Sequence, residues 1–152
     1  EIVRLSYLFK KFSPKLSYVF SAAIKIFTYK SLPAKVYIGD KLIEGDFTII
    51  AMANGRYYGG GFQIAPDASL NDGMFTVVYA HHMPWYKLLA FFPMVPSGKH
   101  VNLKEAIVMK CDKIRVCYDK SYAFNIDGNI IDTDGTIEAE MINNAINVIH
   151  NL

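Results

Sequence analysis

Hydrophobic positions recur at two different periods along this chain, and the period changes near residue 35. Within residues 14–30, an apolar stripe at helical spacing is formed by Leu16, Val19, Phe20, Ala23, Ile24 and Phe27. Ser13 is a favourable N-cap, Pro14 fits the first helical turn, and Pro33 ends the segment. The spacing predicts an amphipathic helix over about residues 14–30.

From Lys35 onward, apolar residues mostly alternate with polar ones or form short runs, which is the pattern of β-strands. Residues 36–38 and 42–43 flank the turn Gly39-Asp40-Lys41 and predict a hairpin. Further strands or extended stretches are expected at residues 47–53, 56–64, 74–80, 107–110, 114–118, 122–126, 136–142 and 145–149, the last two forming a closing hairpin. Residues 84–94 predict a short helix with an apolar face.

Many short strands with close turn signals predict a mainly β fold, a β-sandwich or barrel-like sheet with helices at its edge. The 152 residues are the length of one domain, and we expect a single domain over residues 1–152. A hydrophobic fraction of 52% excludes intrinsic disorder. No uninterrupted apolar run reaches the ~18 residues of a membrane span, and the N-terminal stretch does not read as a secretory signal.

The net charge of +2 is unevenly distributed. Residues 1–35 carry seven Lys or Arg and one acidic residue, a net +6, whereas the remainder carries −4. Such asymmetry indicates an acidic partner for the basic end, or simply a solvated helix face. Cys111 and Cys117 are expected to be reduced core residues in a cytoplasmic protein, and their spacing does not predict a zinc site.

Two loops carry candidate chemistry. The first is Asn54-Gly55-Arg56-Tyr57-Tyr58-Gly59-Gly60-Gly61. Its glycines permit close approach of a backbone or ligand, but no Lys-Ser/Thr follows as in a P-loop, and the residues alone favour a bulged hairpin. The second, residues 65–74, contains Asp67 and Asp72, which offer oxygen ligands for Mg²⁺ or simply cap turns. Near the C-terminus, Asp127-Gly128-Asn129 reads as a turn between strands, with Asp132 and Asp134 close behind it.

Taken in order, Asn54–Gly61, the segment Ile64-Ala-Pro-Asp-Ala-Ser-Leu-Asn-Asp-Gly73, Gly98-Lys-His100 and Ile126-Asp-Gly128 resemble the C-terminal domain of diacylglycerol kinase-like lipid kinases. The resemblance covers essentially the whole chain and implies the β-rich second domain of the NAD kinase/diacylglycerol kinase-like fold. The family's Gly-Gly-Asp-Gly-Thr motif for ATP has no match here. The resemblance therefore implies a separate N-terminal ATP-binding domain, in agreement with a chain that starts at Glu1 instead of Met.

The resemblance also implies roles for particular positions. It places a structural Mg²⁺ on the Asp72 carboxylate with the carbonyls of Ser69 and Met74, and a second Mg²⁺ with ATP on the other domain. It places Asn54, Gly59, Gly60 and Gly61 beside the nucleotide or substrate at the interdomain cleft. It places the general base for the lipid hydroxyl at position 129, where the family usually has glutamate.

Position 129 is Asn in this chain, and an amide does not accept a proton at neutral pH. Three explanations stay open: Asp127 or a nearby acid such as Asp132 serves instead, the turn is offset, or the protein is a weak catalyst. Asp127 is favoured as a structural turn residue over a catalytic one. The leading hypothesis is the substrate-side domain of an ATP-dependent lipid kinase acting on a diacylglycerol-like hydroxyl, inactive without its nucleotide domain. The alternatives are a non-catalytic lipid-binding or regulatory module of the same fold and a generic β-sandwich binding protein.

The expected partners follow from the leading hypothesis. They are the lipid, the ATP-binding domain and, as open alternatives, the inner face of the membrane and a second copy of the chain. Nucleic acid is not an expected partner. The apolar segments at residues 83–95 and around Phe27 are candidates for the acyl-chain site, or plain core.

Overall fold

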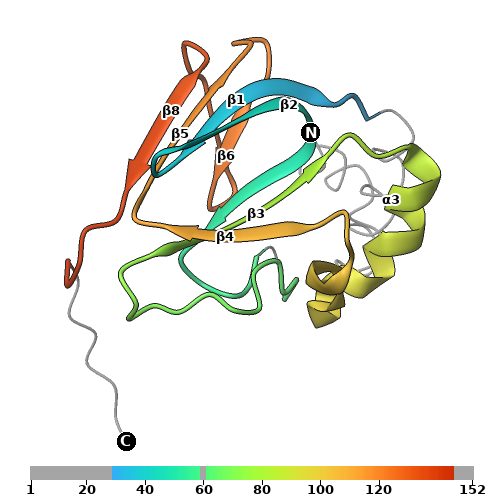
Figure 1. Cartoon of the computed structure of the whole chain (residues 1–152), viewed down its shortest axis with the longest axis horizontal. Helices are drawn as coiled ribbons and strands as arrows, with labels where there is room; N and C mark the ends of the chain where they lie inside the picture. The colour runs from blue at the N-terminus through green and yellow to red at the C-terminus, as the bar shows by residue number, and fades with distance from the viewer. Residues whose placement is uncertain (1–28, 59–60, 146–152) are drawn as a thin grey trace, which may run out of the picture.

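The structure, a computed structural model, describes residues 29–58 and 61–145. In that part of the chain, strands form most of the ordered elements and one helical segment interrupts them (Figure 1). The elements are β1 (Leu32–Ile38), β2 (Lys41–Ala53), β3 (Phe75–His81), α3 (Trp85–Phe91), the 3-10 helices η2 (Phe92–Ser97) and η3 (Lys99–Asn102), β4 (Ile107–Cys111), β5 (Lys113–Tyr118), β6 (Phe124–Ile126), β7 (Asn129–Ile131) and β8 (Thr136–Glu140).

Six strands form one antiparallel sheet in the order β4-β3-β2-β1-β5-β8, and β6 pairs with β7 in a separate two-stranded ribbon. β1 and β4 touch although β2 and β3 lie between them in the sheet order. The sheet therefore curls, and among the strands of the described residues β4 and β8 are its two edges. α3 continues directly into η2, and η3 follows after Gly98; together they form a helical segment beside the β2–β3 part of the sheet (Figure 1).

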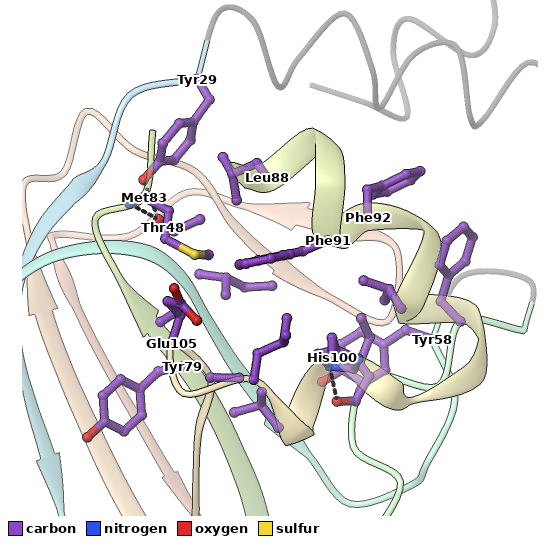
Figure 2. A pocket seen from close by; sticks show the side chains of 18 residues that line it. Tyr29, Thr48, Tyr58, Tyr79, Met83, Leu88, Phe91, Phe92, His100 and Glu105 are labelled. Atoms are coloured by element: carbon purple, nitrogen blue, oxygen red, sulfur yellow. Dashed lines mark hydrogen bonds between the residues drawn. The ribbon is translucent and has the colours of Figure 1, made fainter. Parts of the chain in front are cut away.

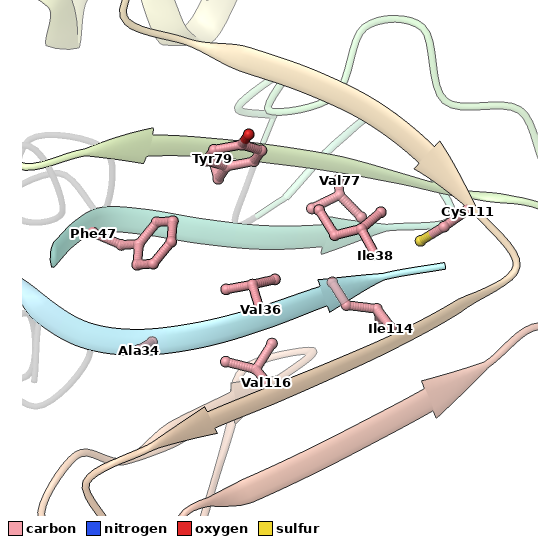
Figure 3. Packing of buried hydrophobic residues seen from close by; sticks show 9 residues of the cluster. All are labelled: Ala34, Val36, Ile38, Phe47, Val77, Tyr79, Cys111, Ile114 and Val116. Atoms are coloured by element: carbon pink, nitrogen blue, oxygen red, sulfur yellow. The ribbon is translucent and has the colours of Figure 1, made fainter. Parts of the chain in front are cut away.

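The inner face of the curled sheet holds the main hydrophobic core, drawn in Figure 3. Side chains alternate along β1, so that Val36 is buried whereas Lys35 is exposed and forms an ion pair with Glu44 at 2.8 Å. The core is made of Ala34, Val36, Ile38, Phe47, Val77, Tyr79, Cys111, Ile114 and Val116, contributed by β1 to β5.

β3 is buried on both faces. Val77 and Tyr79 belong to the main core, whereas Val78 belongs to a second cluster with Ala53, Ala65 and Ala68. The second cluster lies under the long loop between β2 and β3. The side of β3 that carries Val78 is therefore covered by a loop, and it is this side that builds the candidate site.

The structure confirms most of the expected elements. The mainly β fold, the hairpin around Gly39, the strands near residues 47, 75, 107, 114, 124 and 136, and the helix after Pro84 are all present. Cys111 and Cys117 are free thiols, and Cys111 is buried in the core. The helix predicted over residues 14–30 and the strand over 145–149 fall mainly outside the described residues.

One predicted extended stretch is wrong. Of these residues, 56–58 and 61–64 form irregular segments instead of a strand, and the described residues there contain one isolated bridge, between Tyr58 and Phe62. The amides of Gly61 and Phe62 both donate to the Tyr58 carbonyl, which closes a tight turn. Gly61 has a φ of 108°, a conformation open to glycine and costly for other residues, so the chain reverses where an extended stretch was expected.

Candidate functional site

A cavity of about 420 Å³ lies between the helical segment and strands β2 and β3 (Figure 2). The volume is within the ~300–1,000 Å³ typical of small-molecule sites. It corresponds to roughly 14 groups of the size of a water molecule or a methylene, at ~30 Å³ each. The wall is almost entirely apolar and includes Ile49, Phe62, Ile64, Val78, Ala80, Met83, Leu88, Phe91, Phe92, Val95, Leu103 and Ala106.

α3 provides one side of the cavity because its apolar residues recur at helical spacing. Leu88, Phe91 and Phe92 line the cavity, and Lys87 forms an ion pair at 2.8 Å with Glu105, which precedes β4. The hydrogen bond from Lys87 lowers the pKa of Glu105 and raises that of Lys87 itself. This ion pair connects the helix to the opposite wall.

At the rim of the cavity near β2, the hydroxyl group of Thr48 hydrogen bonds to three other residues. The register of β2 against β3 shifts between Phe47 and Ile49, so Thr48 falls at a β-bulge. Its Oγ1 donates to the His81 carbonyl at 2.9 Å and accepts from the Tyr29 hydroxyl at 2.9 Å and the Met83 amide at 3.0 Å. Burial raises the pKa of Tyr29, which stays a neutral donor.

His100 is the polar residue of the cavity wall that sequence reasoning treated only as part of a motif. Its Nε2 lies 3.1 Å from the Ile64 carbonyl, and its Nδ1 is buried with no hydrogen-bond partner in the described part of the chain. Burial lowers the pKa of His100. A neutral ring that donates from Nε2 to the carbonyl leaves Nδ1 as an acceptor.

The lowered pKa of His100 predicts a pH-dependent stability. The unfolded chain takes up a proton near the ordinary histidine value of about 6.5, whereas the folded chain does so at lower pH. The free energy of unfolding should therefore fall as the pH is lowered from about 7 through that window. Urea unfolding at several pH values checks this, with His100→Gln expected to flatten the fall in the free energy of unfolding. An equal slope in His100→Gln would contradict the assignment.

The glycine-rich loop meets the second loop and the cavity. Arg56 donates from Nε to the Ala68 carbonyl at 3.1 Å, which joins the two loops. Tyr58 lines the cavity, and its hydroxyl hydrogen bonds to the Met52 carbonyl. Of the predicted substrate-side residues, Asn54 is exposed at the end of β2 and Gly61 lies in the turn beside Tyr58. Gly59 and Gly60 lie outside the described residues.

The turn that carries Asp127 acts electrostatically on a residue of the same loop. Asp127 and Gly128 have φ values of 48° and 91° and form the tight connection between β6 and β7. The pKa of Tyr58 is raised mainly by burial and further by the charge of Asp127. Asp127 and Asn129 are both exposed, Asn129 at the start of β7, and the charge of Asp127 acts on Tyr58 of the cavity wall. Spacing in the sequence alone carried no signal of the approach between Tyr58 and Asp127.

In the loop predicted to bind a metal, the Asp72 carboxylate forms an ion pair with Lys110. The Asp72 carboxylate accepts from the Lys110 ammonium through Oδ2 at 2.6 Å and from the Met74 amide through Oδ1 at 3.1 Å. The Lys110 hydrogen bond lowers the pKa of Asp72. Among the described residues, no three His, Cys, Asp or Glu side chains gather as a metal site. One carboxylate with the carbonyls of Ser69 and Met74 suits Mg²⁺ in donor type, provided that Lys110 yields its place.

Competition between Lys110 and Mg²⁺ gives a second prediction. Lys110→Met should bind Mg²⁺ roughly fivefold more tightly than the parent chain, since it frees a carboxylate from a surface ion pair. Titration calorimetry with MgCl₂ measures the change, and Lys113→Met, which removes an ion pair to Glu140 elsewhere, is the matched control. Equal Mg²⁺ affinity in the parent and Lys110→Met would mean that the ion does not use this carboxylate.

Residues 6–150 match the family described as the YegS C-terminal NAD kinase β-sandwich-like domain. The chain is 28% identical over 124 residues to a diacylglycerol kinase of Mycobacterium tuberculosis, covering 76% of this chain and 40% of the relative. It is 27% identical over 103 residues to a diacylglycerol kinase of Bacillus subtilis, covering 68% of this chain and 33% of the relative. It is 27% identical over 120 residues to a Stenotrophomonas maltophilia protein named probable lipid kinase YegS-like, covering 78% and 39%.

The fold is also similar to a crystal structure from Bacillus anthracis described as that of a candidate diacylglycerol kinase. The TM-score is 0.62 at 15% identity, and the match covers 94% of this chain and 45% of that chain. The chain spans between 33% and 40% of the length of the three relatives above. Within the described residues, no helix is long and apolar enough to cross a membrane.

Proposed function

Because this chain belongs to the family of YegS C-terminal NAD kinase β-sandwich-like domains, we propose that it is the substrate-side domain of an ATP-dependent lipid kinase. The apolar cavity carries this proposal. A pocket walled by Leu88, Phe91 and Phe92 can hold a hydrocarbon chain and offers little to a polar substrate. The names of the three relatives support the same class of substrate.

In this proposal the lipid hydroxyl lies where the cavity meets the β6–β7 turn. The hydroxyl oxygen attacks the γ-phosphorus of ATP, the bond to the β,γ-bridging oxygen breaks, and ADP leaves. Asp127 accepts the hydroxyl proton. The ATP-binding domain, a separate unit that precedes this one in the family, supplies the nucleotide and its Mg²⁺. Phosphoryl transfer depends chiefly on positioning the reactants and stabilising charge. In this proposal one domain positions the lipid, and the other positions the nucleotide.

The residues that would hold a structural Mg²⁺ in this domain are Asp72, through its carboxylate, and Ser69 and Met74, through their carbonyls. When bound, the ion would cross-link the loop through its charge. Asn54 and the glycines 59–61 would face the nucleotide side of the cleft. Cytoplasmic location and a homodimer stay predictions.

Asn129 favours a second candidate function. With an amide at the position of the usual base, the domain would bind a lipid without phosphorylating it. The assay that separates the two joins the chain to an ATP-binding domain of the family and supplies ATP and a panel of lipids that includes diacylglycerol. Lipid-dependent transfer of the γ-phosphate supports the kinase, and lipid binding without transfer supports the regulatory module.

The cavity itself is tested by filling it. Ala106→Phe places an aromatic ring into the cavity and should weaken the binding of a fluorescent long-chain lipid about tenfold, because the apolar surface that the lipid buries is lost. Displacement fluorimetry on the chain measures this. Ala123→Phe, at an exposed position in the turn before β6, is the matched control. Unchanged lipid binding in Ala106→Phe would show that the chain binds lipid elsewhere, or not at all.

A further inference from the structure

Polar groups stand at both ends of the apolar cavity. Tyr58 and His100 lie at one end, Tyr29 and Thr48 lie at the other, and Phe91 lies between the two ends (Figure 2). At the second end, the Thr48 hydroxyl accepts a hydrogen bond from the Tyr29 hydroxyl. A hydrocarbon that extended past this end would displace such hydrogen bonds without replacing them, which is unfavourable. The apolar space between the two ends is therefore limited in length.

The helical segment is joined to the facing wall of the cavity at two points along its length. The Lys87 ammonium forms an ion pair with Glu105 at 2.8 Å. Further along the segment, the His100 ring lies 3.1 Å from the Ile64 carbonyl. The segment cannot move away from the sheet without losing these contacts. The cavity is therefore limited in width as well as in length.

The volume of the cavity suits one hydrocarbon chain. The space of about 420 Å³ corresponds to about 14 methylene groups at ~30 Å³ each. Two chains of about 16 carbons each would need roughly 1,000 Å³ by the same measure. A long-chain lipid with two chains therefore needs more than twice the space that the cavity offers.

We infer that the cavity takes a single hydrocarbon chain of about 14 carbons. The ligand class that fits it is a lipid with one chain and a head that bears a hydroxyl group, such as a monoacylglycerol. Where a lipid has a second chain, that chain stays outside the cavity and adds little to the affinity. That the ligand is a lipid rests on the proposed function.

A series of saturated monoacylglycerols tests the limit on chain length. Each lipid displaces a fluorescent long-chain lipid from the 152-residue protein, at concentrations below those at which it forms micelles. The affinity should rise about fourfold with each added methylene up to about 14 carbons, and then level off because further carbons find no apolar space. A rise that continues unchanged to about 18 carbons overturns the inference.

A lipid with two short chains tests the limit on the number of chains. A diacylglycerol with two chains of about 8 carbons should bind about twofold more tightly than the monoacylglycerol with one such chain. Either chain can enter the cavity, but only one at a time. A second chain that raises the affinity as much as lengthening the first by the same number of carbons overturns the inference.

Two variants should move the chain length at which the affinity levels off, in opposite directions. Leu88 and Ala106 both line the cavity. Leu88→Ala removes three carbons from the wall and should lengthen the limit by about three carbons, whereas Ala106→Leu should shorten it by about as much. Leu42→Ala, at an exposed leucine of the β1–β2 hairpin, is the matched control and should leave the limit unchanged. The same limit in the parent and in all three variants overturns the inference.

These measurements distinguish failure of this inference from failure of the proposed function. Binding without a length limit, or with both chains inside, overturns the single chain and leaves the lipid site in place. Absence of binding by every lipid of the series overturns the lipid pocket, and with it both proposals. Neither measurement needs ATP or the second domain, so the outcome does not depend on which residue accepts the proton.

Discussion

Replacing Asp127 with asparagine is expected to lower the rate of lipid phosphorylation about 100-fold in the chain joined to an ATP-binding domain. The substitution removes the carboxylate proposed to accept the hydroxyl proton. Asparagine tolerates the left-handed conformation that Asp127 adopts, with a φ of 48°, so the turn should persist. Lipid binding should remain unchanged, and the loss should fall on kcat.

Two further variants test the alternatives for the base. Asp132→Asn should keep the rate, and a loss there as large as that expected of Asp127→Asn would transfer the role to Asp132. Asn129→Glu restores the residue type that the family usually has. If Asp127 serves as the base, Asn129→Glu changes the rate little in the parent chain. A large gain with Asn129→Glu, together with an undiminished rate in Asp127→Asn, would contradict the assignment and identify a native site that lacks its base.

Gly135→Ala is expected to destabilise the domain by about 3 kcal/mol. Gly135 has a φ of 97°, and a Cβ built there would lie 2.4 Å from the carbonyl oxygen of Tyr118. The approach is required because the Tyr118 amide donates to the Gly135 carbonyl at 2.7 Å where β8 begins to pair with β5. The new methyl group cannot be accommodated without moving a strand of the main sheet.

Gly128→Ala separates the clash from the backbone strain. Its φ of 91° is close to that of Gly135, but nothing lies within 4 Å of a Cβ at this position. We expect it to cost about 1 kcal/mol. Chemical denaturation of both variants gives the two free energies of unfolding. Equal losses would mean that conformation alone, and not contact with Tyr118, requires glycine at position 135.

Local patterns in the sequence predicted the sheet well for a physical reason. A strand with one buried face must alternate, and a two-residue turn with glycine fixes where the chain reverses, so the hairpin at Gly39 can be read from a few neighbouring residues. The short helix after Pro84 follows in the same way from its spacing. The family motifs added the domain type, which the comparison with known families confirms.

The candidate site depends on contacts between distant segments, and these have no local signal. The cavity needs β2, β3 and α3 to come together. The approach of Asp127 to Tyr58 joins residues nearly half a chain apart. The ion pair between Lys110 and Asp72 likewise becomes evident only when the pairing of β4 with β3 is known. The extended stretch expected over residues 56–64 is wrong because the chain reverses at Gly61, where a positive φ and the hydrogen bonds to the Tyr58 carbonyl close a turn.

The two edges of the sheet affect whether copies of the chain associate. Backbone groups at an open edge invite a strand from another molecule. At the β8 edge, Glu138 and Glu140 form ion pairs with Arg115 and Lys113 of β5, and a foreign strand would have to settle beside this row of charge. At the β4 edge, Lys110 carries the charge. Within the described residues, these ion pairs place charge along both edges of the sheet, and charge at an edge disfavours the addition of a strand from another copy.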